Sequence, residues 1–116
     1  MGLPNMRGRA GESLALAYLE LIGCRVRERN PHIGGVEVDA LVEDGADTVV
    51  VEVKLRSRSD FGGAAAAVDG TKRQRLLRAA SVLLDRGEPR VRIDVVTVDL
   101  TGDGAELRHY RSAVVT

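Results

Sequence analysis

Two segments of the chain carry apolar residues at helical spacing. Residues 8–22 contain LALAYLELI, whose apolar stripe runs from Leu14 to Ile22, and Gly23 follows where a helix would end. Residues 72–86 contain LLRAASVLL, whose stripe includes both leucine pairs, and a Gly-Glu-Pro sequence comes next. The sequence therefore predicts two amphipathic helices.

Five other segments show the alternation or the β-branched runs that are typical of strands. The first is rich in charged residues, which protect a sheet edge, and an Asp-Gly turn separates the second strand from the third. The predicted order is α-β-β-β-α-β-β. It implies an α/β fold in which helices flank a mixed five-stranded sheet and the strand after the second helix runs parallel to a neighbour. The predicted strands are 24–30, 36–42, 48–55, 92–100 and 105–110.

Length and composition suit one compact domain over residues 1–116. Hydrophobic residues make up 44% of the chain and charged residues 29%, which argues against wholesale disorder. No apolar run approaches the roughly 20 residues that span a bilayer, so we expect no membrane insertion. The first residues lack the apolar core of a secretory signal, so we expect a cytoplasmic protein.

Cys24 is the only cysteine, which excludes an internal disulfide and a cysteine-based zinc site. We expect a half-buried packing thiol there. The two histidines, His32 and His109, stand apart from other candidate ligands, and we expect both at exposed loop or edge positions.

The formal net charge is zero, but the charges are segregated along the chain. Residues 54–58 and 72–78 carry seven basic side chains and no acidic one, while acidic residues gather at 37–47. Because nucleic-acid affinity depends on local phosphate contacts, this distribution keeps a nucleic-acid partner open despite the neutral sum.

The sequence VVVEVKL at 49–55 is the strongest sign of chemistry. A β-branched run of this kind is typical of a strand buried on both faces, where a carboxylate and an ammonium lose hydration unless they find partners. Residues two apart in a strand share a face, so Glu52 and Lys54 point the same way. The preceding strand repeats this pattern with Glu37 and Asp39.

The length of the turn decides whether the two charged pairs meet. A four-residue turn, Asp44 to Asp47, would place Asp39 opposite Glu52 and Glu37 opposite Lys54, whereas a two-residue turn would place the two glutamates opposite each other. Either even length puts all four groups on one face, and an odd length would separate them.

Two interpretations follow from that constellation. Opposed carboxylates repel unless they are protonated or bridged by a cation, and hard oxygen ligands favour Mg²⁺ or Mn²⁺. A lysine beside them can orient a water or stabilise charge on phosphorus, which fits phosphodiester hydrolysis. The alternative is a structural salt-bridge cluster. Asp39 lies thirteen residues before Glu52, with a turn midway and acidic partners on the same face, and this favours the metal site.

Asp39 followed by Glu52-Val53-Lys54, after a helix that bears Glu12, resembles the PD-(D/E)XK nuclease superfamily. The ordered segments GRAGESLALAYLELIGCRVRERN, VEVDALV, VVVEVKLRS, FGGAAAAV, KRQRL and RIDVV resemble the YraN family of small bacterial proteins over nearly the whole chain. The resemblance implies a restriction-endonuclease-like core, similar to Holliday junction resolvases.

The resemblance also implies roles for particular residues. Asp39, Glu52 and the Val53 carbonyl would bind the metal, and Lys54 would position the attacking water. Glu37 would be a further ligand or support one. Glu12 would approach the metal from the first helix, unless it only complements the helix dipole in the first turn.

Basic residues near these positions are candidates for phosphate contacts, with a solvated helix face as the alternative. A loop around 61–63 supplies glycines that would let it close over nucleic acid. Aromatic content is only 3%, which disfavours stacking on unpaired bases. The candidate nucleic-acid ligands are Arg56, Arg58, Lys72, Gln74, Arg75 and Arg78.

The sequence therefore predicts a metal-dependent endonuclease that acts on duplex, branched or damaged DNA, with Mg²⁺ or Mn²⁺ as cofactor. The alternative is a nuclease-fold module with little or no catalysis that binds nucleic acid or a protein. Zero net charge permits a homodimer. Arg92 and Asp94 alternate like the hairpin pairs, and they either brace the site or form a structural ion pair.

Overall fold

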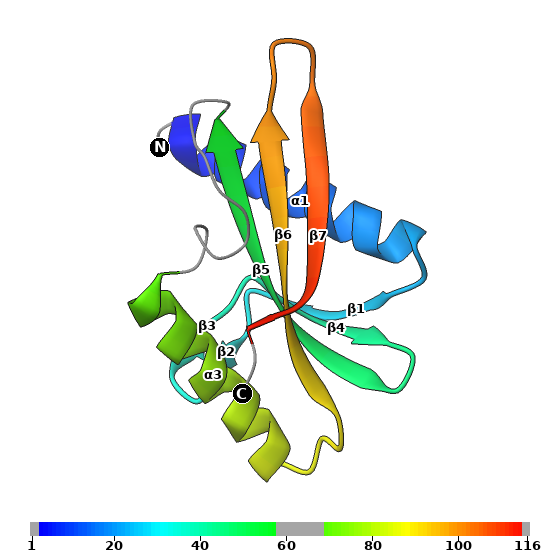
Figure 1. Ribbon diagram of the computed structural model, residues 1–116, viewed down its shortest axis with the longest axis vertical. Helices are drawn as coiled ribbons and strands as arrows, with labels where there is room; N and C mark the ends of the chain where they lie inside the picture. Colours follow the sequence, from blue (N-terminus) through cyan, green and yellow to red (C-terminus); the bar gives the residue numbers. More distant parts are fainter. Residues whose placement is uncertain (1–2, 58–68, 115–116) are drawn as a thin grey trace.

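The computed structural model describes residues 3–57 and 69–114. Two long helices lie on opposite sides of a central sheet, and a small two-stranded hairpin lies beside the second helix (Figure 1). The elements are α1 (Leu3–Leu21), β1 (Arg25–Arg29), β2 (His32–Ile33), β3 (Val36–Glu37), β4 (Ala40–Asp44), β5 (Asp47–Ser57), α3 (Gly70–Asp85), β6 (Val91–Leu100) and β7 (Ala105–Val114).

The central sheet has the order β1-β4-β5-β6-β7. Strands β5 and β6 are parallel, joined through α3, and every other pair is antiparallel. The predicted fold class is therefore confirmed as an α/β fold with a mixed five-stranded sheet flanked by helices. Strand β1 is an edge, as its charged alternation predicted.

The sheet carries a separate hydrophobic core on each face, because successive strand residues point to opposite sides. Val49 and Val51 of β5 pack with Leu16 and Leu19 of α1. Val50, between them, packs with residues of α3 such as Leu83. A strand that is apolar on both faces belongs in the middle of a sheet, which is where β5 lies.

The hairpin register matches the four-residue turn. Ala40 pairs with Val51, and the ladder continues to the Asp44–Asp47 pair around Gly45, whose φ is +60°. This register directs Glu52 and Lys54 to the α3 face, since Val50 on the same side packs against α3.

The predicted strand 36–42 is wrong, because the chain breaks it after Glu37. Gly34 and Gly35 both have positive φ, at +60° and +79°, which suits a tight primed turn between β2 and β3. A Cβ on Gly34 would lie 2.5 Å from a methyl of Val82, so the turn also needs glycine for close packing on α3. Glu37 pairs with His32, not with Lys54.

The buried face of α1 also differs from the predicted stripe. Ala15, Leu16 and Leu19 are buried, whereas Leu14 and Leu21 are 43% and 87% exposed. In α3, Leu76 and Leu83 are buried as expected, but Leu84 is exposed. Both stripes have helical spacing, and only the angle at which each helix meets the sheet selects the buried one.

Candidate functional site

Asp39 and Glu52 meet at the start of β4, beside β5. The strand pairing stops at Ala40 and Val51, and the backbone N–H of Val53 donates to Oδ2 of Asp39 at 2.7 Å. The Asp39 carboxylate thus accepts the hydrogen bond that a backbone carbonyl would accept if the strand pairing continued. This bond holds the carboxylate against β5. The predicted meeting of Asp39 with Glu52 is present, although Asp39 itself lies just outside β4.

Burial and the neighbouring Glu52 carboxylate raise the pKa of Asp39 from 3.8 to about 7, against the lowering effect of the Val53 N–H. Glu52 is only 8% exposed, so water screens the repulsion between the two carboxylates poorly. Such a pair is stable with a shared proton or with a cation between its oxygens.

Lys72 supplies a positive charge from the first turn of α3. Its Nζ lies 2.6 Å from Oε2 of Glu52. Burial lowers the pKa of Lys72, but the hydrogen bond and the charge of Glu52 outweigh that effect and raise it overall. Sequence pattern predicted Lys72 as a phosphate ligand only and missed this contact, since nothing local links the start of α3 to β5.

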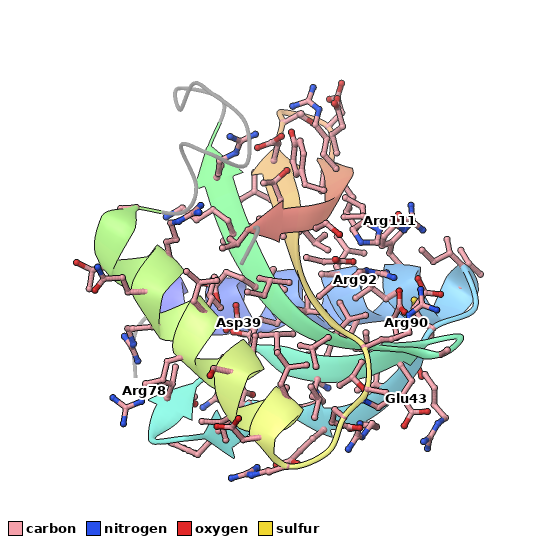
Figure 2. All side chains as sticks on the ribbon, turned by 60° about the horizontal axis from the view of Figure 1, so that its bottom comes forward. Asp39, Glu43, Arg78, Arg90, Arg92 and Arg111 are labelled. Atoms are coloured by element: carbon pink, nitrogen blue, oxygen red, sulfur yellow. The ribbon has the colours of Figure 1, made fainter. Side chains whose placement is uncertain are left out.

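These groups line one cavity of about 350 Å³ between α3, β5 and the β2–β3 hairpin. Figure 2 shows Asp39 in the interior between α3 and the sheet, while Arg78 points outward from α3. The cavity brings together four of the five predicted catalytic residues, and Lys54 is the exception. Its lining is Glu12, Asn30, Val36, Glu37, Asp39, Glu52, Lys72, Arg75 and Leu76.

Glu12 lies on the cavity wall, where the side-chain amide of Asn30 donates to its carboxylate at 3.2 Å. Because α1 begins at Leu3, Glu12 is not in the first turn of the helix, and the alternative of dipole complementation is wrong. Lys54 shares the face of Glu52, is half-buried and pairs with Thr97 of β6. Within the described part of the chain, the buried hydroxyl of Thr97 has no hydrogen-bond partner.

The basic candidates divide by position. Arg56, a predicted nucleic-acid ligand, is buried, and its guanidinium donates to both oxygens of Asp99, at 2.7 and 3.1 Å. Gln74 and Arg78 are exposed on α3, and Arg75 is exposed at the cavity. Arg58 and the loop at 61–63 lie outside the described residues.

The donor set of the cavity fits a hard divalent cation. In the described part of the chain, no three His, Cys, Asp or Glu side chains converge closely enough to hold a metal by themselves. Proteins usually bind Mg²⁺ through one or two carboxylates, while waters and substrate phosphates complete its six ligands. Asp39 and Glu52 supply two such carboxylates in this cavity.

A second charged network lies on the α1 face. Asp94 is 1% exposed, and it accepts hydrogen bonds from Arg92 at 3.0 Å and from the Ser112 N–H at 3.0 Å. Its other oxygen lies 2.8 Å from Nε2 of His109, whose Nδ1 lies 3.0 Å from the hydroxyl of Tyr18.

This network settles the alternatives for Arg92 and Asp94 in favour of a structural ion pair. The predicted exposure of His109 is wrong, since its side chain is 4% exposed, whereas that of His32 is confirmed. Cys24 is more buried than expected, and burial raises the pKa of its thiol. Among the described residues, no helix has the length and apolarity to cross a membrane.

A mixed five-stranded sheet with a helix on each face defines the chain as an α/β protein. The model of a family described as "Uncharacterised protein family UPF0102" matches residues 11–98, so the chain belongs to that family. UPF0102 is the YraN family, which confirms the resemblance found in the motifs.

Individual relatives cover most of the chain. A UPF0102 protein of Dechloromonas aromatica (strain RCB) is 47% identical over 109 residues, covering 92% of this chain and 89% of that protein. A UPF0102 protein of Halorhodospira halophila is 44% identical over 110 residues, covering 95% and 88%. The solved structure of Pyrococcus furiosus SfsA in complex with Ca²⁺ aligns with a TM-score of 0.45 and 16% identity, over 93% of this chain and 63% of that one.

Proposed function

We propose that this protein is a metal-dependent endonuclease that hydrolyses DNA phosphodiester bonds, with structured, branched or damaged DNA as its substrate. The observation that supports this most is the carboxylate pair of half-buried Asp39 and buried Glu52, in a cavity that also receives Lys72 and Arg75. Buried carboxylates are costly to hold together, and a divalent cation relieves that cost.

The roles of the chain's own groups follow from their places. Asp39 and Glu52 would hold Mg²⁺ or Mn²⁺, with the Val53 carbonyl as a third ligand, and the ion would supply charge neutralisation at phosphorus. The Val53 N–H keeps the Asp39 carboxylate oriented. Lys54, on the face of Glu52, would orient the attacking water, while Lys72 and Arg75 would contact phosphate oxygens.

Metal binding and cleavage test this proposal together. Calorimetry with Mn²⁺ and Mg²⁺ is expected to show binding to the wild type that is lost in Asp39→Asn and in Glu52→Gln. Glu43→Gln is the matched control, because Glu43 pairs with Arg25 on β1, away from the cavity. Labelled duplex, nicked and four-way-junction DNA would be incubated with each variant. A wild type that binds no metal and cuts none of these DNAs would refute the endonuclease.

A second candidate is a nuclease-fold module that binds nucleic acid without turnover. The position of Lys54 supports it, because the family's strand lysine lies off the cavity wall in this protein while Lys72 neutralises Glu52. Metal and DNA binding without cleavage would select this candidate.

A further inference from the structure

Lys72 occupies the place at Glu52 that a metal ion would need. The 2.6 Å contact uses Oε2 of Glu52, and the side chains of Lys72 and Glu52 are 39% and 10% exposed. The ion pair therefore lies at the inner wall of the cavity, where solvent screens it less than it would screen a surface pair.

The start of α3 directs Lys72 toward Glu52. Asp69 is the N-cap residue, and its side chain accepts a hydrogen bond from the Lys72 backbone N–H at 2.9 Å. The Arg73 N–H donates to the Asp69 carbonyl at 2.8 Å, so the first turn is held at both residues. This capping places the Lys72 side chain over β5 before any ligand arrives.

Arg75 provides the contrast within the same cavity. It lies one turn further along α3 and lines the cavity, but it is exposed and forms no ion pair among the described residues. If these side chains only attracted phosphate, both Lys72 and Arg75 would serve. Neutralising the buried Glu52 carboxylate, in contrast, requires only Lys72, which contacts it.

We propose that Lys72 is the resident counter-ion of the metal-free site: it leaves Glu52 when a divalent cation binds to Asp39 and Glu52, and it then contacts a phosphate of the bound nucleic acid. This inference rests on the proposed function, since it concerns how the same site is loaded. Two cations cannot share one carboxylate oxygen without strong repulsion, so Lys72 and the metal compete. A phosphate that accepts Lys72 favours metal binding, and by reciprocity the metal favours phosphate binding.

The first test is the affinity for Mn²⁺ without DNA, measured by calorimetry on the full chain. Lys72→Met is expected to bind Mn²⁺ on the order of tenfold more tightly than the wild type, within the range of ordinary coupling between sites. Arg75→Met is the matched control and is expected to stay within about twofold, because it releases no carboxylate. Lys72→Arg, which keeps the charge, is expected to bind as the wild type does.

The second test is DNA affinity, measured by fluorescence anisotropy with a short duplex. In EDTA, Lys72→Met is expected to bind as the wild type does, since Lys72 is held by Glu52. With Ca²⁺, which prefers the same oxygen ligands, it is expected to bind several-fold more weakly.

Unchanged or weaker Mn²⁺ binding in Lys72→Met would overturn the counter-ion role while leaving the endonuclease intact. If that variant loses its thermal unfolding transition, Lys72→Gln replaces it, because the amide still donates to Glu52, and the same tightening is required. If neither wild type nor variant binds any divalent cation, both this inference and the proposed function fail.

Discussion

Asp94 lies in strand β6 of the central sheet and Asp39 lies just before strand β4, but the two carboxylates are on opposite faces of the sheet and have opposite surroundings. Asp94, on the α1 face, is bonded to Arg92, His109 and the Ser112 N–H. Asp39, on the α3 face, receives one backbone N–H and faces a second carboxylate, Glu52.

The difference separates a structural charge from a functional one. A buried carboxylate with enough donors stabilises one arrangement of the strands around it, and no ligand is needed. A carboxylate that faces a second carboxylate in a partly buried site lowers the stability of the fold through their repulsion. Such pairs are common at sites where a ligand supplies the missing positive charge. The α3 face is therefore the face on which the proposed cation would act.

The largest contrast is expected from the same substitution on each face. Asp94→Asn removes the charge that Arg92 and His109 surround, and we expect a loss of about 3 to 5 kcal/mol in the free energy of unfolding. Asp39→Asn is expected to keep or increase stability at pH 7.5, because the amide oxygen still accepts from Val53 and the repulsion by Glu52 is removed. Urea denaturation measures both. A loss below about 1 kcal/mol for Asp94→Asn would break the contrast.

A second, smaller effect is expected in the pH dependence of Asp39. Its pKa is raised from 3.8 to about 7 in the folded protein. As pH rises from about 4 to 7, the unfolded chain releases this proton while the folded one retains it, so the wild type loses stability relative to low pH. The difference in stability between Asp39→Asn and wild type should therefore grow across this window, by about 2 to 4 kcal/mol at most.

Paired urea titrations between pH 4 and 8 measure this growth, and taking the difference between the variants cancels the other carboxylates. Added Mg²⁺ at pH 7.5 should stabilise only the wild type, because ligand binding to the folded state alone shifts the equilibrium. A flat difference across the window would show that burial and Glu52 together do not raise the pKa of Asp39.

The smallest effect concerns Thr97, beside Lys54 on the α3 face. Its hydroxyl is fully buried and has no hydrogen-bond partner among the described residues, so Thr97→Val should be neutral or stabilising by up to about 1 kcal/mol. Thr48→Val is the control and should destabilise, because the Thr48 side chain hydrogen-bonds to Glu88. The denaturation midpoint in urea measures both. A clear loss of stability in Thr97→Val would show that the hydroxyl has a partner in solution.

Strand periodicity predicted the part of the site that the β4–β5 hairpin forms. The spacing of Asp39 from Glu52 and the even turn placed the two carboxylates together, and the register of β4 on β5 confirms it. The prediction for Glu37 failed because the alternation at 36–42 does not show that the chain leaves its strand after Glu37. The sign lies just before that segment, in Gly34 and Gly35, whose positive φ values form the turn of a separate hairpin.

Local pattern therefore determined the two helices, the strand order along the chain, the two-faced burial of β5 and the pairing of Asp39 with Glu52. These depend on periodicity, on turn residues and on the alternation of side chains, which act over a few neighbouring positions. The family motifs follow the same order along the chain.

Only the tertiary structure decided which stripe of α1 is buried, that Arg56 is buried against Asp99, and that His109 joins Asp94 to Tyr18. It also placed Lys72 against Glu52. Each of these depends on the angle at which a helix or a distant strand packs on the sheet. Contacts between residues far apart in the sequence follow from the total packing of both cores, and no local spacing encodes them.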